Sequence, residues 1–479
     1  MTGPEGARRR DVLRLGAAAA GAAGLWQAGV PAGAASTAST TMSTSTATGA
    51  STSTTRGEPA TAARTDAAAA HAWVRTAYRA VQLENLTPPT AARAYAHAAL
   101  AMYEAAVAGM PHHVSLAGTV QGLVGPQGPQ PEAGRGRLDW SVAVSAAAHD
   151  VLDALLPHRD PRTRPLLQDA HAAVLAERAA AGSGARLLAA SARHGSTAAS
   201  RVVGRALADG HAEASARAYV PPSGQPWHWV STPPNYRPTI EPYCADVRPF
   251  LLRSTDEVEP APTVPFSTAP GSAFHAQAMT VLEQSRANTD AERATARFWT
   301  DNPGSFTPPF GTATGLPAGH WMRIASQATE QRGLPLDETL EALARLGLTT
   351  MDAFLACWTS KYRSNLLRPV TYINRWIDPT WVSWVNTPQF PEHTSGHSVA
   401  SAAASVVLTD LLGERPFVDD TQAHLGMPSR TFASFEEAAQ EAAASRLYGG
   451  IHYPSGIEAG LDQGRRIGAL AVDRLRTRR

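Results

Sequence analysis

Three short segments carry the residues best suited to acid–base and anion chemistry. They are WTSKYRSNLLRP at 358–369, PEHTSGHS at 391–398 and SRLYGGIH at 445–452. Together they supply three fixed cations, a serine hydroxyl, a glycine backbone and two histidines, namely Lys361, Arg368, Arg446, Ser395, Gly396, His397 and His452. These are the groups needed to hold a tetrahedral oxyanion and to move protons to and from it.

The first segment is expected at the end of a long helix. Lys361 and Arg368 are seven residues apart, which is two helical turns, so both cations can reach the same side. Pro369 disfavours helical geometry at Arg368 and marks the end of the helix. By itself, such a pair is more often a solvated helix face than a site.

The second segment is expected to begin a helix. Ser395 precedes an apolar, alanine-rich run at 399–412, so it is predicted to be a helix N-cap. Free N–H groups at a helix start bind anions, and Gly396 allows the backbone to approach closely. His397 would then lie in the first turn. Taken alone, an ordinary serine cap with a surface histidine explains this pattern.

The third segment is expected to follow a helix at 435–446 that carries Arg446 at its end. The pair Gly449-Gly450 allows the chain to turn, so that Arg446 and His452 converge. Burying two arginines and a lysine together without partners costs several kcal/mol per charge, so such a cluster requires a resident anion. The three segments therefore jointly predict an oxyanion site.

The elements that position these segments are predicted to be helical. Apolar residues recur at helical spacing, and the N-terminal half shows no sustained two-residue alternation, so the fold class is all-α. The predicted helices span 66–83, 88–108, 138–156, 161–181, 185–209, 272–287, 291–301, 319–332 and 337–365. A single catalytic domain is expected over 65–479, with N-terminal helices at 65–210, an irregular Pro/Trp-rich segment at 211–270 and site-bearing helices at 271–479.

The N-terminal residues are predicted to be a targeting segment and a tether. Residues 1–35 contain Arg8-Arg9-Arg10 followed by a weakly apolar Ala/Gly-rich run, typical of a twin-arginine export signal. Residues 36–64 are rich in Ser, Thr and Ala and are expected to be disordered. Export to the periplasm or the exterior would follow. The formal net charge of +1 gives no indication of nucleic acid as a partner, and no membrane span is expected.

The three segments resemble the signature motifs shared by vanadium-dependent haloperoxidases and the type 2 phosphatidic acid phosphatases with their bacterial acid phosphatase relatives. The matching pattern is Lys361-x6-Arg368-Pro369, Ser395-Gly396-His397 and Ser445-Arg446-x5-His452. Similarity to soluble, exported bacterial haloperoxidase-like proteins extends from about 291 to 460. The resemblance implies an all-α fold of helical bundles, vanadate or phosphate in the site, and hydrogen peroxide, halide and a small organic molecule as substrates. It leaves the oligomeric state open.

The resemblance also implies a role for each residue. His452 would bond vanadium, or attack phosphorus in a phosphatase, and His397 would be the acid or base on the opposite side. Lys361, Arg368, Arg446, Ser395 and the Gly396 N–H would hold the oxyanion, with Lys361 also polarising peroxide. Trp358 and Phe390 stand where the haloperoxidases place aromatic side chains near halide, although both could equally be core residues.

The chain departs from the family pattern after the second histidine. The family usually carries an acid four residues further on, and here that position is Gly456. Because a carboxylate that orients a ligand histidine is worth roughly 10–100-fold in metal affinity or activity, its loss puts vanadate affinity in doubt. Glu458 or Asp462 would be the local substitutes. His393 and Thr394 replace an aromatic residue and a proline of the commoner pattern.

Three functions are compatible with these residues. The first is a vanadate-dependent haloperoxidase that oxidises halide with hydrogen peroxide to a hypohalous-acid equivalent. The second is a soluble secreted acid phosphatase that hydrolyses phosphomonoesters through a phosphohistidine. The third is an oxyanion-binding protein without turnover. Halogenation and ester hydrolysis assays with and without vanadate separate them.

Overall fold

The computed structural model describes residues 61–126, 138–234, 236–301 and 314–479. Residues 59–479 form one compact unit. Both the export signal predicted at 1–35 and residues 36–60 of the predicted tether lie outside the described residues. The last residues of that tether are ordered, because Ala62–Arg64 form a 3-10 helix and Ala62 is buried. The folded part therefore starts slightly before residue 65.

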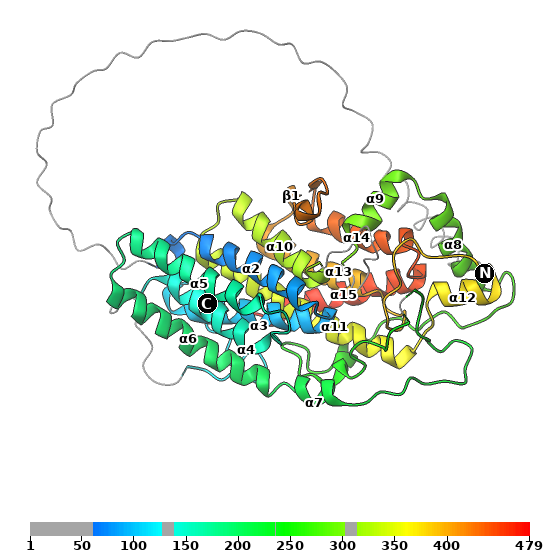
Figure 1. Cartoon of the computed structure of the whole chain (residues 1–479), viewed down its shortest axis with the longest axis horizontal. Helices are drawn as coiled ribbons and strands as arrows, with labels where there is room; N and C mark the ends of the chain where they lie inside the picture. The colour runs from blue at the N-terminus through cyan, green and yellow to red at the C-terminus, as the bar shows by residue number, and fades with distance from the viewer. Residues whose placement is uncertain (1–60, 127–137, 235, 302–313) are drawn as a thin grey trace, which may run out of the picture. The chain divides into compact units, whose positions relative to one another are not determined.

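Helices account for most of the described chain (Figure 1). Their bounds are α2 Ala68–Glu84, α3 Pro88–Ala106, α4 Trp140–Leu155, α5 Thr163–Ala180, α6 Ala185–Leu207, α7 His211–Ala216, α8 Ala273–Ala287, α9 Asp290–Phe298, α10 Leu316–Gln331, α11 Leu336–Ser364, α12 Pro369–Trp376, α13 Gly396–Leu412, α14 Phe435–Tyr448 and α15 Pro454–Arg474. Strands β1 Phe417–Asp419 and β2 Arg430–Phe432 pair antiparallel, with Val418 opposite Thr431. The all-α prediction is confirmed.

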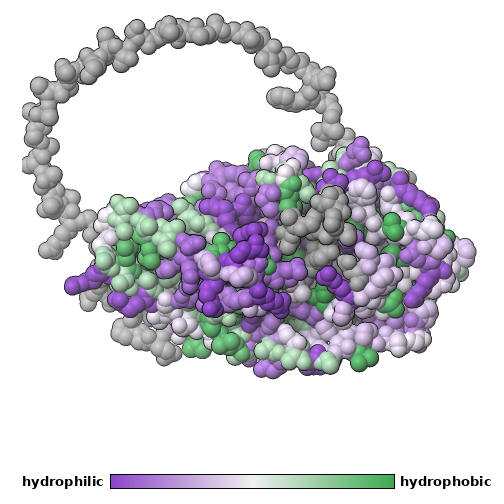
Figure 2. All heavy atoms as spheres, viewed as in Figure 1, coloured by the Kyte–Doolittle hydropathy of each residue, from purple (hydrophilic) through white to green (hydrophobic). Residues whose placement is uncertain are grey.

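Two of the helices are buried along most of their length. These are α3 and α11, which pack against each other. In Figure 1, α2–α6 are grouped towards the left in blue to green, and α13–α15 lie towards the right in orange to red. The face shown in Figure 2 mixes hydrophilic and hydrophobic residues. No helix among the described residues combines the length and the apolar character needed to cross a membrane.

Small residues bring α13 and α15 close together. A Cβ added at Gly464 would lie 2.3 Å from the carbonyl oxygen of Val399, and one added at Gly460 would lie 2.9 Å from that of Ser395. Both positions therefore require glycine, because real Cβ atoms do not approach backbone oxygen so closely. This packing fixes the start of α13, which carries Ser395 and His397.

The Pro/Trp-rich segment wraps around α11. After α7 it is irregular apart from two 3-10 turns, Cys244–Asp246 and Thr255–Val258. The buried carboxylate of Asp352 accepts hydrogen bonds from the backbone N–H groups of residues 250, 251 and 252 at 2.7–2.9 Å. The carbonyl oxygen of Ile240 accepts from Trp358 Nε1 at 3.1 Å. The segment is thus held by the helix that carries Lys361.

Candidate active site

The structure brings the three predicted segments together. Arg368, directly after α11, and His452, between α14 and α15, are in hydrogen-bond contact, with Arg368 Nη1 3.1 Å from His452 Nε2. His452 also lies close enough to three other site residues, Lys361, Arg446 and His397, for each of them to lower its pKa. The principal cause of the low pKa of His452 is burial.

Each segment adopts the local structure that its sequence predicts. Ser395 is the N-cap of α13, and its hydroxyl accepts a hydrogen bond from Ser398 N. Arg368 has extended backbone and caps α12, with Pro369 as the first helical residue. Arg446 lies in the last turn of α14, and Gly450 then adopts a positive φ of 74°, which glycine tolerates without strain.

The three cations are fully buried and lack carboxylate partners. Lys361, Arg368 and Arg446 are each 0% exposed, and none forms an ion pair within the described part of the chain. Burial lowers the pKa of Lys361 to about 8, that of Arg446 to about 9 and that of Arg368 to about 10. Nearby Glu392 offsets only part of the effect of burial on Lys361 and Arg368. Because buried charges without a direct ion pair cost several kcal/mol each, the site favours an anion.

Several polar atoms of this cluster have no hydrogen-bond partner among the described residues. They are Arg368 Nη2, Arg446 Nε and Nη2, and His397 Nε2. Buried donors of this kind are normally satisfied. Two guanidinium groups with free N–H donors and an imidazole nitrogen form the donor set that suits a tetrahedral oxyanion. The residues present therefore fit vanadate or phosphate.

Lys361 is arranged differently from the two arginines. Its Nζ donates to the carbonyl oxygens of Pro391, Glu392 and Thr394 at 3.1, 3.0 and 2.5 Å. An ammonium group has three N–H donors, so all three are used. Lys361 ties the 391–394 loop to α11, and contact with an oxyanion requires one of these bonds to exchange.

The tautomer of His452 follows from its two neighbours. Arg368 only donates hydrogen bonds, so His452 Nε2, which faces Arg368 Nη1, must accept and cannot carry a proton. The proton therefore lies on Nδ1, which donates to Glu392 Oε1 at 2.8 Å. The single lone pair of Nε2 is thus the acceptor for Arg368 Nη1, and a bond from Nε2 to an electrophilic centre held by the arginines requires this hydrogen bond to exchange.

His397 is attached to a residue that sequence reasoning did not assign to the site. The carbonyl oxygen of Trp299 hydrogen-bonds His397 and raises its pKa, but burial and Arg446 hold that pKa well below the ordinary value. The same carbonyl accepts from Arg446 Nη1 at 2.6 Å. Trp299 therefore positions both residues through its backbone, a role for which its side-chain type gives no signal.

The two aromatic residues lie beside the cations. Phe390 is 4.8 Å from Trp358, ring centroid to ring centroid. Lys361 Nζ is 5.0 Å from the Phe390 centroid, and Arg368 Cζ is 4.8 Å from it. Both aromatic side chains are largely buried, and cation–π contact stabilises the charges. A role near halide stays a prediction.

The structure gives no steric reason for glycine at position 396, and His393 contacts a backbone carbonyl oxygen. A Cβ at Gly396 would lie in ordinary contact, 3.7 Å from Trp358, so the surrounding protein does not require glycine there. His393 directs Nε2 to the carbonyl oxygen of Ala261 at 3.1 Å, and burial lowers its pKa to about 4. Cys244 and Cys357 are both buried free thiols.

A buried histidine with two acidic partners lies next to Trp299. His320 Nδ1 is 2.6 Å from Asp301 Oδ2, and its Nε2 is 2.8 Å from Asp419 Oδ2. The imidazole stacks on Trp299 with centroids 4.5 Å apart. The two aspartates raise the pKa of His320 to about 10 against the opposing effect of burial. His320 is therefore an imidazolium at neutral pH.

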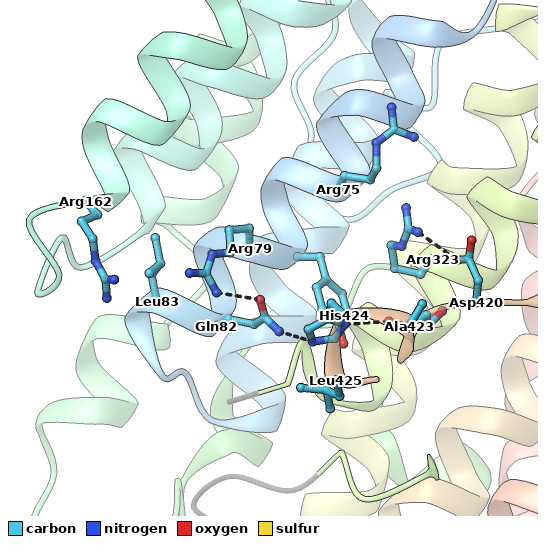
Figure 3. A pocket seen from close by; sticks show the side chains of 12 residues that line it. Arg75, Arg79, Gln82, Leu83, Arg162, Arg323, Asp420, Ala423, His424 and Leu425 are labelled. Carbon is cyan, nitrogen blue, oxygen red and sulfur yellow. Dashed lines mark hydrogen bonds and ion pairs between the residues drawn. The ribbon is translucent and has the colours of Figure 1, made fainter. Parts of the chain in front are cut away.

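A cavity of about 700 Å³ lies between α2, α10 and residues 420–425 (Figure 3). None of the nine predicted site residues lines it. Four arginines do, but Arg75, Arg162 and Arg323 pair with carboxylates, and Arg79 donates to Gln82 at 3.3 Å. Its positive charge is largely neutralised, so the oxyanion chemistry is assigned to the cluster around His452.

The fold is all-α, and its cluster of buried cations and histidines fits a tetrahedral oxyanion. Residues 341–479 match the family model described as "VCPO second helical-bundle domain". The structure is similar to that of a bacterial vanadium-dependent iodoperoxidase, with 33% sequence identity and a TM-score of 0.78 over 86% of this chain and 97% of that one. The chain belongs to the vanadium-dependent haloperoxidase family.

Two other solved structures share the fold. They are the holo and apo forms of a bacterial vanadium-dependent chloroperoxidase, with 17% and 16% identity and TM-scores of 0.56 and 0.57. Each match covers 81% of this chain, and 92% and 95% of the respective structures. No curated protein sequence matches the chain significantly.

Proposed function

We propose that the protein is a vanadate-dependent haloperoxidase that oxidises halide with hydrogen peroxide. The observation that carries the proposal is the unprotonated His452 Nε2, held beside buried arginine N–H donors that have no partner in the part of the chain that the structure describes. Because the 33% identical relative is named as an iodoperoxidase, iodide is the first halide to examine. A small organic molecule would be the final acceptor.

Vanadate would be held by the residues of this cluster. His452 Nε2 would bond the metal, and Arg368 and Arg446 would donate hydrogen bonds to its oxygens and offset their charge. Ser395 and the Gly396 N–H at the start of α13 would add donors. When bound, vanadate supplies a Lewis-acid centre at which peroxide becomes reactive towards halide.

The remaining residues would manage protons, charge and solvent. His397 Nε2 is unpartnered, so it can accept a proton from peroxide and return it to a leaving oxygen. Lys361 would contribute positive charge. It would act through a direct hydrogen bond once one of its carbonyl bonds exchanges, or electrostatically from its present position. Trp358 and Phe390 would exclude water from the halide side, which strengthens the electrostatic interactions within the site.

The experiment compares halogenation with ester hydrolysis. Purified protein, with and without orthovanadate, is given peroxide with iodide or bromide, and separately a chromogenic phosphate monoester. We expect halogenation only in the presence of vanadate. Ester hydrolysis that vanadate inhibits, without halogenation, would instead support the phosphatase, which uses the same donors for phosphate. Tight vanadate binding with neither activity would support a binding protein.

We also propose export by the twin-arginine route, on the basis of Arg8-Arg9-Arg10 and the run that follows. Replacing Arg9 and Arg10 by lysine is expected to keep the protein inside the cell, because receptors read this motif as an address rather than as a charge. The measurement is the fraction of protein outside the inner membrane in a twin-arginine-competent host. Unchanged export of the double variant would contradict the proposal.

A further inference from the structure

The oxyanion site contains a buried carboxylate that the sequence pattern does not assign. Glu392 lies between Phe390 and the start of α13 and is 0% exposed. Its Oε1 accepts hydrogen bonds from His452 Nδ1 at 2.8 Å and from the backbone N–H of Tyr453 at 3.1 Å. It therefore holds both the imidazole and the adjoining peptide.

Glu392 is itself held from several sides. Its backbone N–H donates to the carbonyl oxygen of Leu366 at 2.9 Å, and its carbonyl oxygen accepts from Lys361 Nζ at 3.0 Å. The backbone of Glu392 is thus fixed by two residues of the Lys361–Arg368 segment, while its carboxylate is held through Oε1, and Oε2 has no hydrogen-bond partner among the described residues. A side chain placed in this way can fix the orientation of the histidine that it contacts.

Gly456 accounts for the space that Glu392 occupies. A Cβ at this position would lie 2.3 Å from Glu392 Oε1 and 2.8 Å from Oε2. Any side chain at residue 456 would therefore enter the volume of this carboxylate. Glycine at 456 therefore leaves room for the Glu392 carboxylate, and an acid at 456 would place its own carboxylate in the same region.

The two local substitutes considered from sequence do not reach His452 by any hydrogen bond or ion pair in the described structure. Asp462 pairs with Arg466 at 3.1 Å, with its side chain 66% exposed. Glu458 is exposed, and desolvation raises its pKa. The expectation that either residue replaces the missing acid is not supported, because the partner of His452 is 60 residues before it in the chain.

We propose that Glu392 is the positioning residue that keeps the proton of His452 on Nδ1, so that Nε2 is unprotonated and can bond vanadate when its hydrogen bond from Arg368 exchanges. The inference rests on the proposed function only in taking vanadate as the bound oxyanion. The carboxylate touches neither substrate nor metal and acts through the histidine. Loss of such an outer partner typically costs about 10–100-fold in metal affinity.

The test measures equilibrium binding of two anions to the purified full chain. In Glu392→Gln we expect vanadate to bind about 10–100-fold more weakly. Sulfate, which cannot take a histidine nitrogen as a further ligand, should bind at least as well, because the N–H donors of Arg368 and Arg446 are unchanged. Weaker binding of vanadate without weaker binding of sulfate indicates a positioning role. Loss of structure would weaken the binding of both anions.

A second experiment moves the carboxylate from residue 392 to residue 456 and asks whether vanadate binding is restored. Glu392→Ala should weaken vanadate binding at least as much as Glu392→Gln, and adding Gly456→Asp should restore much of it, whereas Gly456→Asp alone should be destabilising through the close contact with Glu392. Glu458→Gln is the matched control and should leave both anions unaffected. Unchanged vanadate affinity in Glu392→Gln, or a parallel loss of vanadate and sulfate in Glu392→Gln, would overturn the inference.

These outcomes are independent of turnover. Wild-type protein that binds vanadate in a Glu392-dependent manner without halogenating would refute the proposed function but support the positioning role. If the wild-type protein halogenates and Glu392→Gln retains full vanadate affinity, the proposed function is supported and the positioning role of Glu392 is refuted.

Discussion

Replacement of His452 by alanine is expected to eliminate vanadate-dependent halogenation. The imidazole offers the one unprotonated ring nitrogen that faces Arg368, at 3.1 Å. Losing a direct bond to the metal should exceed the roughly 10–100-fold effect of losing an outer partner. The measurements are the halogenation rate and the vanadate dissociation constant. Sulfate should still bind, because the arginines remain.

The matched control is His149→Ala. His149 lies on α4, is partly exposed and contacts Asp150, so its loss should change neither measurement. Circular dichroism and an unfolding curve would show that His452→Ala is folded. Full activity in a folded His452→Ala protein would refute the role assigned to this residue.

Replacement of His320 by alanine is expected to produce the largest loss of stability. The residue separates two aspartates whose side chains are fully buried, as is its own. Removing one member of a buried ion pair costs on the order of 3–5 kcal/mol, because the other charge is left without compensation. Here two carboxylates are left, so the cost should be at the upper end. Chemical denaturation provides the measurement.

The same cluster predicts how stability depends on pH. The folded pKa of His320 is raised to about 10, whereas an unfolded histidine titrates near 6.5. The contribution of protonated His320 to the free energy of unfolding is therefore fully present below about pH 6.5 and is lost as the pH rises through about 10. The free energy of unfolding of the wild type should fall across this window relative to that of His320→Ala.

His424, which is exposed, provides a control for both measurements. It accepts or donates only neutral hydrogen bonds, to Gln82 and to the carbonyl oxygen of Thr421. His424→Ala should cost much less stability than His320→Ala and should leave the alkaline slope in place. Equal losses for the two variants would show that the buried ion pairs contribute little.

Much of the fold follows from local signals. The helix predicted at 272–287 is α8, and Ser272 is its N-cap, with a hydroxyl that accepts a hydrogen bond from His275 N. Helices α12 and α15 were not predicted, and the short pair of strands β1 and β2 was not either. Three residues per strand are too few to show a two-residue alternation.

The sequence predicted only part of the site, because partners that come from distant segments leave no local pattern. Positive charges and histidines at fixed spacing indicate an anion, because burying them is costly without one. Glu392 was not predicted as the partner of His452 because the family pattern places the acid after this histidine. In the fold, packing brings the acid from the preceding motif instead. Asp301 and Asp419 flank His320 from elements far apart in sequence, which spacing cannot predict. Gly456 was the one local signal, since it marks space filled by another chain segment.

The arrangement around Lys361 has a consequence for which residue type this position accepts. Three carbonyl oxygens converge on one ammonium, much as they converge on a metal ion in a cation-binding turn. A guanidinium is planar and spreads its hydrogens outward, so it cannot satisfy three converging acceptors from one point. The position therefore selects the tetrahedral shape of lysine and not its charge alone, and arginine would be a poor replacement.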